Sequence, residues 1–189
     1  GSQSLYDAAK RTVHGTNYGM SPTMLHRTYP EVFPSKKEAQ AAQDRYFTLF
    51  PKIKRWQDAI INRAHLDARL VNDFGYVRWL WFVKKPAKRK GEWDWERGED
   101  AKAAIATLPQ SSAAVIMRRA IGSPQAQRLL QSGRLFLTIH DELIARAEEK
   151  KLNWVDHTLK EAMEFPVAEQ GGRVFKTTGK RGINWGEMR

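Results

Sequence analysis

The feature that most constrains the fold is a change in hydrophobic periodicity near residue 70. Before this point, apolar residues recur at helical spacing and predict helices over residues 4–15, 35–50 and 51–66. After it, β-branched and aromatic residues flank an Asp-Phe-Gly turn, which predicts a hairpin over residues 70–80. We therefore expect an α+β fold, with an all-helical unit at residues 1–69 and a mixed unit at residues 70–189.

The mixed unit contains further helices and strands. Residues 100–120 have a helical composition, but Pro109 should break or kink that helix because proline has no amide proton to donate. A short helix near residues 125–130 follows. Towards the end of the chain, the patterns predict an amphipathic helix and then strands, at residues 154–165, 174–178 and 183–185.

A second expected hairpin carries the most informative polar cluster. An apolar strand at 134–139 and a returning strand at 143–147 predict a tight turn formed by His140, Asp141 and Glu142. Carboxylates held outward at a rigid turn suit a hard divalent cation. Because aspartate is also a preferred turn residue, an ordinary polar turn is the alternative interpretation.

Another candidate site lies on the first helix. Lys10, His14 and Tyr18 are spaced four residues apart, so they project from one face over about 12 Å. They form a stripe of a cation, an imidazole and a phenol, and Gly15 beside it would let a flat partner approach the backbone. An ordinary exposed polar helix face can have the same spacing, so the spacing alone leaves both interpretations open.

Charge indicates the class of partner. The chain has 32 Lys and Arg against 21 Asp and Glu, a net charge of +11, which favours nucleic acid over an anionic membrane surface. It has no cysteine, which excludes disulfides, thiolate metal sites and cysteine nucleophiles. There is no apolar run long enough to span a bilayer and no secretion signal pattern, so we expect a cytoplasmic protein with no membrane partner.

Residues 84–100 combine basic residues, acidic residues and tryptophans. Five positive charges at 84–90 are followed at once by acidic residues, so much of this field should cancel locally. Trp93 and Trp95 could stack on bases. Their acidic neighbours favour a packed loop instead.

Three motifs occur in order along the chain. Residues 8–20 read Ala-Ala-Lys-Arg-Thr-Val-His-Gly-Thr-Asn-Tyr-Gly-Met, residues 106–114 read Ala-Thr-Leu-Pro-Gln-Ser-Ser-Ala-Ala, and residues 137–143 read Leu-Thr-Ile-His-Asp-Glu-Leu. They resemble, respectively, the fingers helix, a palm helix and the metal-binding hairpin of family A DNA polymerases, the bacterial DNA polymerase I type. The resemblance extends from about Tyr6 to the end of the chain.

This resemblance implies roles for individual residues. Lys10 would be catalytic by neutralising phosphate oxygens of the incoming deoxynucleoside triphosphate, and His14 and Tyr18 would line the nascent base pair. Asp141 would be catalytic as a ligand of Mg²⁺ in two-metal phosphoryl transfer. Primer-template DNA would be contacted by Tyr18, Gly19, Gln110, His140 and Glu142.

Four positions differ from the family pattern. Tyr6 stands where the family has Arg, His14 where it has Phe or Tyr, Ala106 where it has Asn, and Ser111 where it has Gly. The family's first palm strand, which carries a second metal-binding Asp, precedes the fingers and has no counterpart here. The family's thumb has none either.

We therefore expect a divergent, phage-like member of the family. The chain would be the fingers, residues 1–69, and the C-terminal part of the palm, residues 70–189, of a longer DNA-directed DNA polymerase. Its missing N-terminal part would complete the metal site, so the chain alone should be inactive. The alternative is a non-catalytic basic DNA-binding module. We expect the longer protein to act in a bacterial or phage-infected cell.

Overall fold

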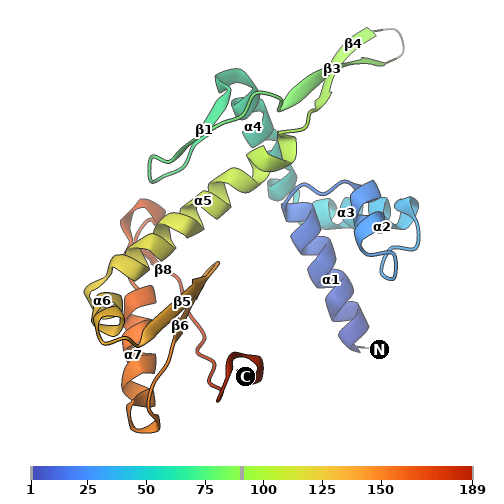
Figure 1. Ribbon diagram of the computed structural model, residues 1–189. Coiled ribbons are helices and arrows are strands. Elements are labelled where there is room, and N and C mark those ends of the chain that lie inside the picture. The colour runs from blue at the N-terminus through green and yellow to red at the C-terminus, as the bar shows by residue number, and fades with distance from the viewer. Residues whose placement is uncertain (1, 90–91, 189) are drawn as a thin grey trace. The chain divides into compact units, whose positions relative to one another are not determined.

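The computed structural model describes residues 2–89 and 92–188 (Figure 1). Helices and small antiparallel sheets confirm the predicted α+β class. The chain forms two compact units, one up to Pro109 and one from Gln110. Among the described residues, no helix is both long and apolar enough to cross a bilayer.

Four helices begin the first unit: α1 (Ser2–Asn17), α2 (Pro22–Thr28), α3 (Lys36–Leu49) and α4 (Pro51–Asp67). Three of them match the sequence patterns. Helix α2 was not predicted by the sequence patterns, and it begins because the Ser21 side chain accepts a hydrogen bond from the Met24 amide at 3.2 Å. Ser35 caps α3 in the same way, accepting from the Glu38 amide at 3.2 Å.

The predicted hairpin near residue 70 is confirmed as β1 (Arg69–Val71) and β2 (Val77–Trp79). In its turn, Asn72 Oδ1 accepts hydrogen bonds from the Phe74 and Tyr76 amides at 3.0 and 2.9 Å. Gly75 adopts a φ of +80°, which the turn requires.

A further hairpin follows, formed by β3 (Lys84–Arg89) and β4 (Glu92–Arg97). The packed loop expected around Trp93 and Trp95 is therefore wrong. Tryptophans and acidic residues alternate along β4 because alternate strand residues point to opposite faces.

The main core of the first unit joins α4, the two ends of the first hairpin, and the start of α5 (Ala101–Gly122). It contains Ile60, Ile61, Ala64, Leu70, Leu80, Val83, Ala101, Ala104 and Ile105. A smaller cluster of Leu25, Phe33 and Ala39 holds α2 against α3.

Helix α5 passes through Pro109 without ending, so of the break or kink expected there the break is wrong and the kink stays a prediction. Proline removes one hydrogen bond, the one that the carbonyl of Ile105 would accept. The flanking residues are rich in alanine, the strongest helix former, and Ile105 is anchored in the core. These contributions keep the helix continuous.

The second unit contains α6 (Pro124–Gln131), β5 (Leu135–Ile139), β6 (Glu142–Ala145) and α7 (Leu152–Met163). Short elements complete it: η1 (Glu149–Lys151), β7 (Pro166–Val167), η2 (Ala168–Gln170), β8 (Arg173–Val174) and η3 (Trp185–Glu187). Its core consists of Ala126, Leu129, Leu135, Val155 and Ala162.

The strands expected at the end of the chain are mostly wrong. Of the two predicted ranges, 174–178 and 183–185, the described structure has a strand only at Val174, the end of β8. Its partner β7 is two residues long and leads at once into η2, which limits the pairing. Within the described part of the chain, residues 175–184 pair with no strand, and a 3-10 turn begins at Trp185.

Candidate functional site

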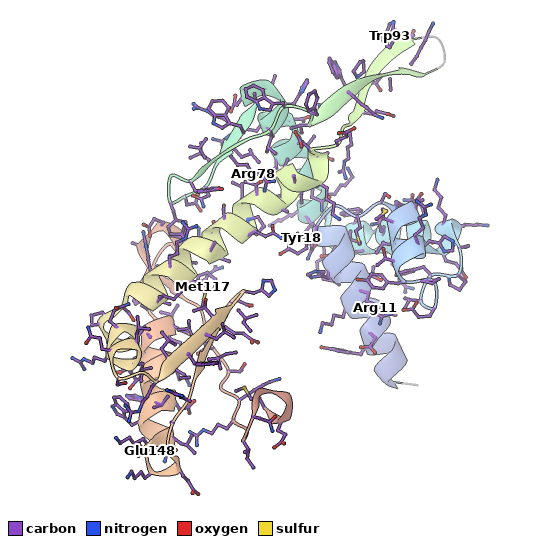
Figure 2. All side chains as sticks on the ribbon, viewed as in Figure 1. Arg11, Tyr18, Arg78, Trp93, Met117 and Glu148 are labelled. Carbon is purple, nitrogen blue, oxygen red and sulfur yellow. The ribbon has the colours of Figure 1, made fainter. Side chains whose placement is uncertain are left out.

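Lys10 and His14 lie four residues apart on α1, and Tyr18, labelled in Figure 2, follows the end of the helix four residues later, so the three form one stripe. The rings of His14 and Tyr18 are in contact, with centroids 4.9 Å apart and planes inclined by 54°. Tyr18 follows the last helical residue, but its amide still donates to the His14 carbonyl at 3.2 Å. Lys10 and His14 are exposed and Tyr18 is half-buried. The stripe therefore offers a cation and two rings to a ligand.

Two buried glutamines hold the end of this stripe. Gln57 of α4 donates from Nε2 to the Thr16 carbonyl at 2.7 Å and to the Asn17 carbonyl at 3.3 Å. Gln43 of α3 donates to the Met20 carbonyl at 2.7 Å and to Thr16 Oγ1 at 3.3 Å. The last carbonyls of a helix lack partners within it, and Gln57 donates to two of them. The Thr16 carbonyl also accepts from the Gly19 amide at 3.0 Å, and Gln43 holds the segment after the helix. We call Gln43 and Gln57 the amide clamp.

The amide clamp was not among the predicted site residues, although the sequence contains a signal for it. Gln43 lies three residues before the buried Tyr46, and Gln57 lies three residues before the buried Ile60. A glutamine on the buried face of a helix needs a polar partner inside the protein. Tyr46 adds a third link, because its hydroxyl donates to Asn17 Oδ1 at 2.8 Å.

Both glycines near the stripe allow close packing. A Cβ at Gly15 would lie 2.7 Å from Leu25 Cδ2, so the backbone there is covered and the expected approach of a flat partner is wrong. Gly19 has a φ of +70°, and a Cβ there would lie 2.7 Å from Ile105 Cδ1. A DNA contact at Gly19 stays a prediction.

The second candidate site is the turn between β5 and β6. Ile139 pairs with Glu142, so the turn itself has two residues, and Glu142 begins β6 rather than belonging to the turn as expected. His140 adopts a φ of +51°, in the left-handed region that only a few per cent of non-glycine residues occupy. Asp141 comes next and is exposed, as are its neighbours on both sides.

The Asp141 carboxylate is available to a ligand. Among the residues that the structure describes, its side chain forms no hydrogen bond or ion pair. Asp141 and Glu142 supply hard oxygen donors, the kind that Mg²⁺ prefers. Among all the residues that the structure describes, however, no group of three or more histidine or carboxylate side chains could hold a metal. These two residues fit part of a magnesium site, but not a whole one.

Gln110, the third element of the predicted site, is exposed on α5 directly after Pro109. It belongs to the second unit, as does the turn at His140 and Asp141. Lys10 and the rest of the stripe belong to the first unit. The predicted residues thus form two local groups, one in each unit.

A family model described as DNA polymerase family A matches residues 2–187. The chain belongs to DNA polymerase family A. The match spans the stripe on α1, Gln110 and the β5–β6 turn, and it confirms the resemblance found from the three motifs.

Curated relatives agree with the family A assignment. The thermostable DNA polymerase I of Thermus aquaticus is 29% identical over 164 residues, which are 85% of this chain and 18% of that protein. DNA polymerase I of Caldicellulosiruptor bescii is 28% identical over 184 residues, 96% of this chain and 20% of that protein. This chain therefore spans about a fifth of the length of these relatives.

A solved structure shares the fold. The POL domain of Pol1 from M. smegmatis, in complex with DNA primer-template and dNTP, matches with a TM-score of 0.67 and 24% identity. The match covers 85% of this chain and 27% of that one.

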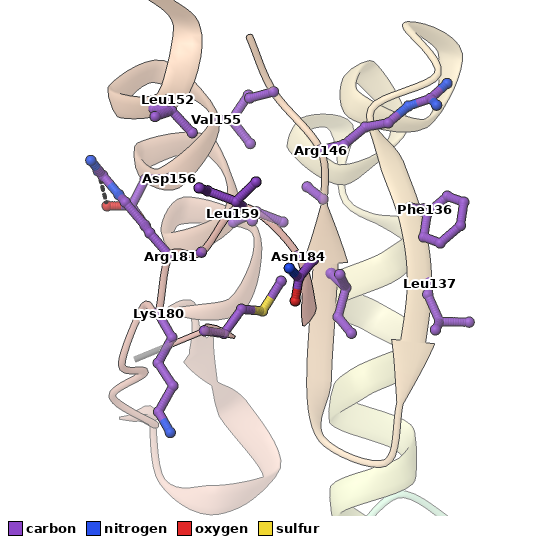
Figure 3. Close-up of a pocket in the computed structure, with 16 residues that line it drawn as sticks. Phe136, Leu137, Arg146, Leu152, Val155, Asp156, Leu159, Lys180, Arg181 and Asn184 are labelled. Carbon is purple, nitrogen blue, oxygen red and sulfur yellow. Dashed lines mark hydrogen bonds and ion pairs between the residues drawn. The ribbon is translucent and has the colours of Figure 1, made fainter. Parts of the chain in front are cut away.

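The second unit of this family A chain also contains a cavity of about 290 Å³ between β5–β6, α7 and the C-terminal segment (Figure 3). Its lining combines apolar and basic side chains, among them Phe136, Leu137, Leu159, Lys180 and Arg181. Arg181 is bound to Asp156 of α7 by an ion pair of 2.9 Å. No sequence motif predicts this cavity.

Two carboxylates of the second unit have strongly lowered pKa values. The pKa of Glu164 falls to about 2, mainly because Lys176 Nζ donates to it at 2.8 Å and the Thr177 amide at 2.9 Å. The pKa of Glu169 falls to about 2 because the Arg119 guanidinium donates to it. Both lie outside the predicted site and tie segments of the second unit together.

Proposed function

We propose that this chain is part of a DNA-directed DNA polymerase, which extends a primer with deoxynucleoside triphosphates along a DNA template. The observation that carries the proposal is the family match over residues 2–187. The solved relative from M. smegmatis, which is described with DNA primer-template and dNTP, supports the choice of partners. Since the chain spans about a fifth of its relatives, the activity is proposed for a longer protein.

The stripe on α1 would bind the nucleotide. The exposed ammonium of Lys10 would neutralise triphosphate oxygens, an interaction that strengthens as charge develops on the phosphate. The contacting rings of His14 and Tyr18 offer a flat, polarizable surface for the nascent base pair. We assign this stripe, with Gly19 at its end, to the fingers at residues 1–69.

The β5–β6 turn would hold the metal in the palm, residues 70–189. Asp141 is the side chain we assign to Mg²⁺, with Glu142 beside it, and the bound metal would neutralise the developing phosphate charge. His140 fixes the backbone direction at this turn through its left-handed conformation. We assign Gln110, His140 and Glu142 to contacts with the primer-template.

The remaining metal ligands would come from another part of the longer protein. Asp141 and Glu142 give too few ligands for two cations, and two-metal catalysis needs carboxylates that converge on both. We therefore propose that an N-terminal part supplies the second metal-binding carboxylate and completes the active site.

The test is primer extension by the longer protein, with the Asp141→Asn variant beside it. Removing a metal ligand should lower the rate by about three orders of magnitude or more while duplex binding persists. Glu149→Gln is the matched control, because it also neutralises an exposed carboxylate of the second unit. Near-wild-type extension by Asp141→Asn would refute the metal assignment.

The 189-residue chain provides a second test. We expect it to bind DNA weakly, with an affinity that falls as salt rises, and to extend no primer. Extension by the chain that disappears in its Asp141→Asn variant would show that no further carboxylate is needed. If the longer protein binds DNA without extending primers at any Mg²⁺ concentration, the non-catalytic binding module is the correct function.

A further inference from the structure

The β3–β4 hairpin has two chemically different faces. In its register, Lys84 pairs with Arg97, Pro86 with Trp95, and Lys88 with Trp93. Directly opposed residues of an antiparallel pair share a face, and alternate residues along each strand change face. One face, the tryptophan face, therefore carries Lys84, Pro86, Lys88, Trp93, Trp95 and Arg97.

The opposite face carries the acidic residues Glu92, Asp94 and Glu96, together with Ala87 and Lys85. Lys85 is bound to Glu96 by an ion pair of 3.3 Å. Residues 84–97 contain six basic and three acidic residues, so the charges cancel only in part. The three acidic residues all lie on this face. Among the described side chains, the tryptophan face has three cations and no carboxylate.

The two indoles of the tryptophan face are largely open to solvent. Trp93 is 74% exposed and lies near the end of the hairpin, and Trp95 is 55% exposed (Figure 2). Trp95 contacts the His65 ring of α4 at a centroid distance of 4.8 Å. Arg97 pairs with Asp58 of the same helix at 3.4 Å. These contacts anchor the base of the hairpin and leave Trp93 projecting.

The tryptophan face also has cations available. Within the described part of the chain, Lys84 and Lys88 form no ion pair, whereas Arg97 is already paired. Lys88 lies directly across the strands from Trp93. A ligand that stacks on Trp93 would therefore find an ammonium group beside it.

We propose that the tryptophan face binds single-stranded nucleic acid, with bases stacked on Trp93 and Trp95 and phosphates near Lys84 and Lys88. Exposed indoles combined with cations are the recurring platform for unpaired strands. Residues two apart on a strand are about 7 Å apart. That is roughly twice the 3.4 Å spacing of stacked bases, so one base fits between the indoles.

Single strands fit this face better than the other polyanions. Duplex bases are already stacked on one another, so the indoles have no base plane to contact, and an acidic peptide offers charge without planar groups. The proposal rests on the hairpin's own residues and needs neither Mg²⁺ nor a nucleotide. It is therefore independent of the proposed polymerase activity.

The experiment measures the fluorescence anisotropy of a fluorescein-labelled twelve-nucleotide oligo-dT with the 189-residue chain, in EDTA and at low salt. We expect Trp93→Ala and Trp95→Ala each to weaken binding by about tenfold. Trp93→Phe should retain most of the affinity because it keeps a stacking ring. The control is Trp154→Ala, which removes an exposed indole of α7 in the second unit and should change little.

Two lysines of β3 separate a specific contact from general electrostatics. Lys88→Gln and Lys85→Gln remove the same charge from the same strand, but Lys88 is on the tryptophan face and Lys85 on the acidic face. We expect Lys88→Gln to weaken binding several-fold more than Lys85→Gln. Equal effects would overturn the proposal.

Three further outcomes would also overturn it. One is equal affinity of the wild-type chain, Trp93→Ala and Trp93→Phe for oligo-dT. Another is a duplex of the same length that competes as well as oligo-dT. The third is displacement of oligo-dT by poly-glutamate at equal charge, which would assign the face to acidic protein segments.

Discussion

Replacing Gln57 with leucine should destabilise the first unit by about 1–2 kcal/mol, because two backbone carbonyls would lose the buried amide that donates to them. Gln57 is 1% exposed and donates at 2.7 Å to the Thr16 carbonyl and at 3.3 Å to that of Asn17. Leucine fills nearly the same volume, so the cavity cost is small. The backbone carbonyls remain in the variant. That of Thr16 also accepts from the Gly19 amide at 3.0 Å, so the penalty falls mainly on the carbonyl of Asn17.

The measurement is urea unfolding followed by tryptophan fluorescence, which mainly reports on the first unit. Five of the seven tryptophans lie there: Trp56, Trp79, Trp81, Trp93 and Trp95. With a slope of about 1.5 kcal/mol per molar urea, the midpoint should fall by roughly 0.7–1.3 M. Gln40→Leu is the matched control, because Gln40 is exposed and its hydrogen bond to Asp44 is on the surface.

A midpoint for Gln57→Leu within about 0.3 M of that for Gln40→Leu would refute the reasoning, because surface changes usually stay within about 0.5 kcal/mol. The buried amides would then contribute no more than a surface contact. The position of the α1 C-terminus would need another explanation, such as packing of Gly15 against Leu25 alone.

Two further predictions concern charge. In the longer protein, Lys10→Ala should lower kcat/KM for nucleotides by tenfold or more, whereas an unchanged value would remove Lys10 from the site. The pKa of Glu164 is lowered in the folded chain, so its stabilising contribution is present above about pH 4.5 and is lost as pH falls towards 2. Glu164→Gln should therefore flatten the loss of stability between pH 4.5 and 2, as followed by urea midpoints; an unaltered slope would contradict this.

Local patterns predicted most of the helices and two hairpins. The Ser35 cap and the Asn72 turn are encoded by the residues that form them, so the sequence alone is sufficient there. The β3–β4 hairpin was not predicted, because a sum of charges along the chain does not show which residues share a face. Strand alternation sorts the same charges onto two faces. The strands predicted at 174–178 and 183–185 were mostly wrong, because a strand needs a partner strand to pair with as well as apolar side chains.

The candidate site also has one part that local sequence patterns predict and another that depends on residues far apart in the chain. Lys10, His14 and Tyr18 lie within nine consecutive positions, so helical spacing is enough to group them. The amide clamp joins residues 27 and 41 positions apart, and no local pattern specifies which carbonyl a buried glutamine will meet. The left-handed conformation of His140 was likewise not visible, because histidine adopts ordinary φ values at most positions.

The amide clamp at the end of α1 and the stripe that it positions should respond differently to salt concentration. The glutamine amides carry no charge, so neither ionic strength nor a nearby polyanion competes for the bonds that they donate. Lys10 is exposed, and its attraction to phosphates weakens as salt rises. A change in salt concentration should therefore alter how often a ligand occupies the stripe. It should not loosen the amide clamp, so the C-terminal end of α1 keeps its position whether or not a polyanion is bound.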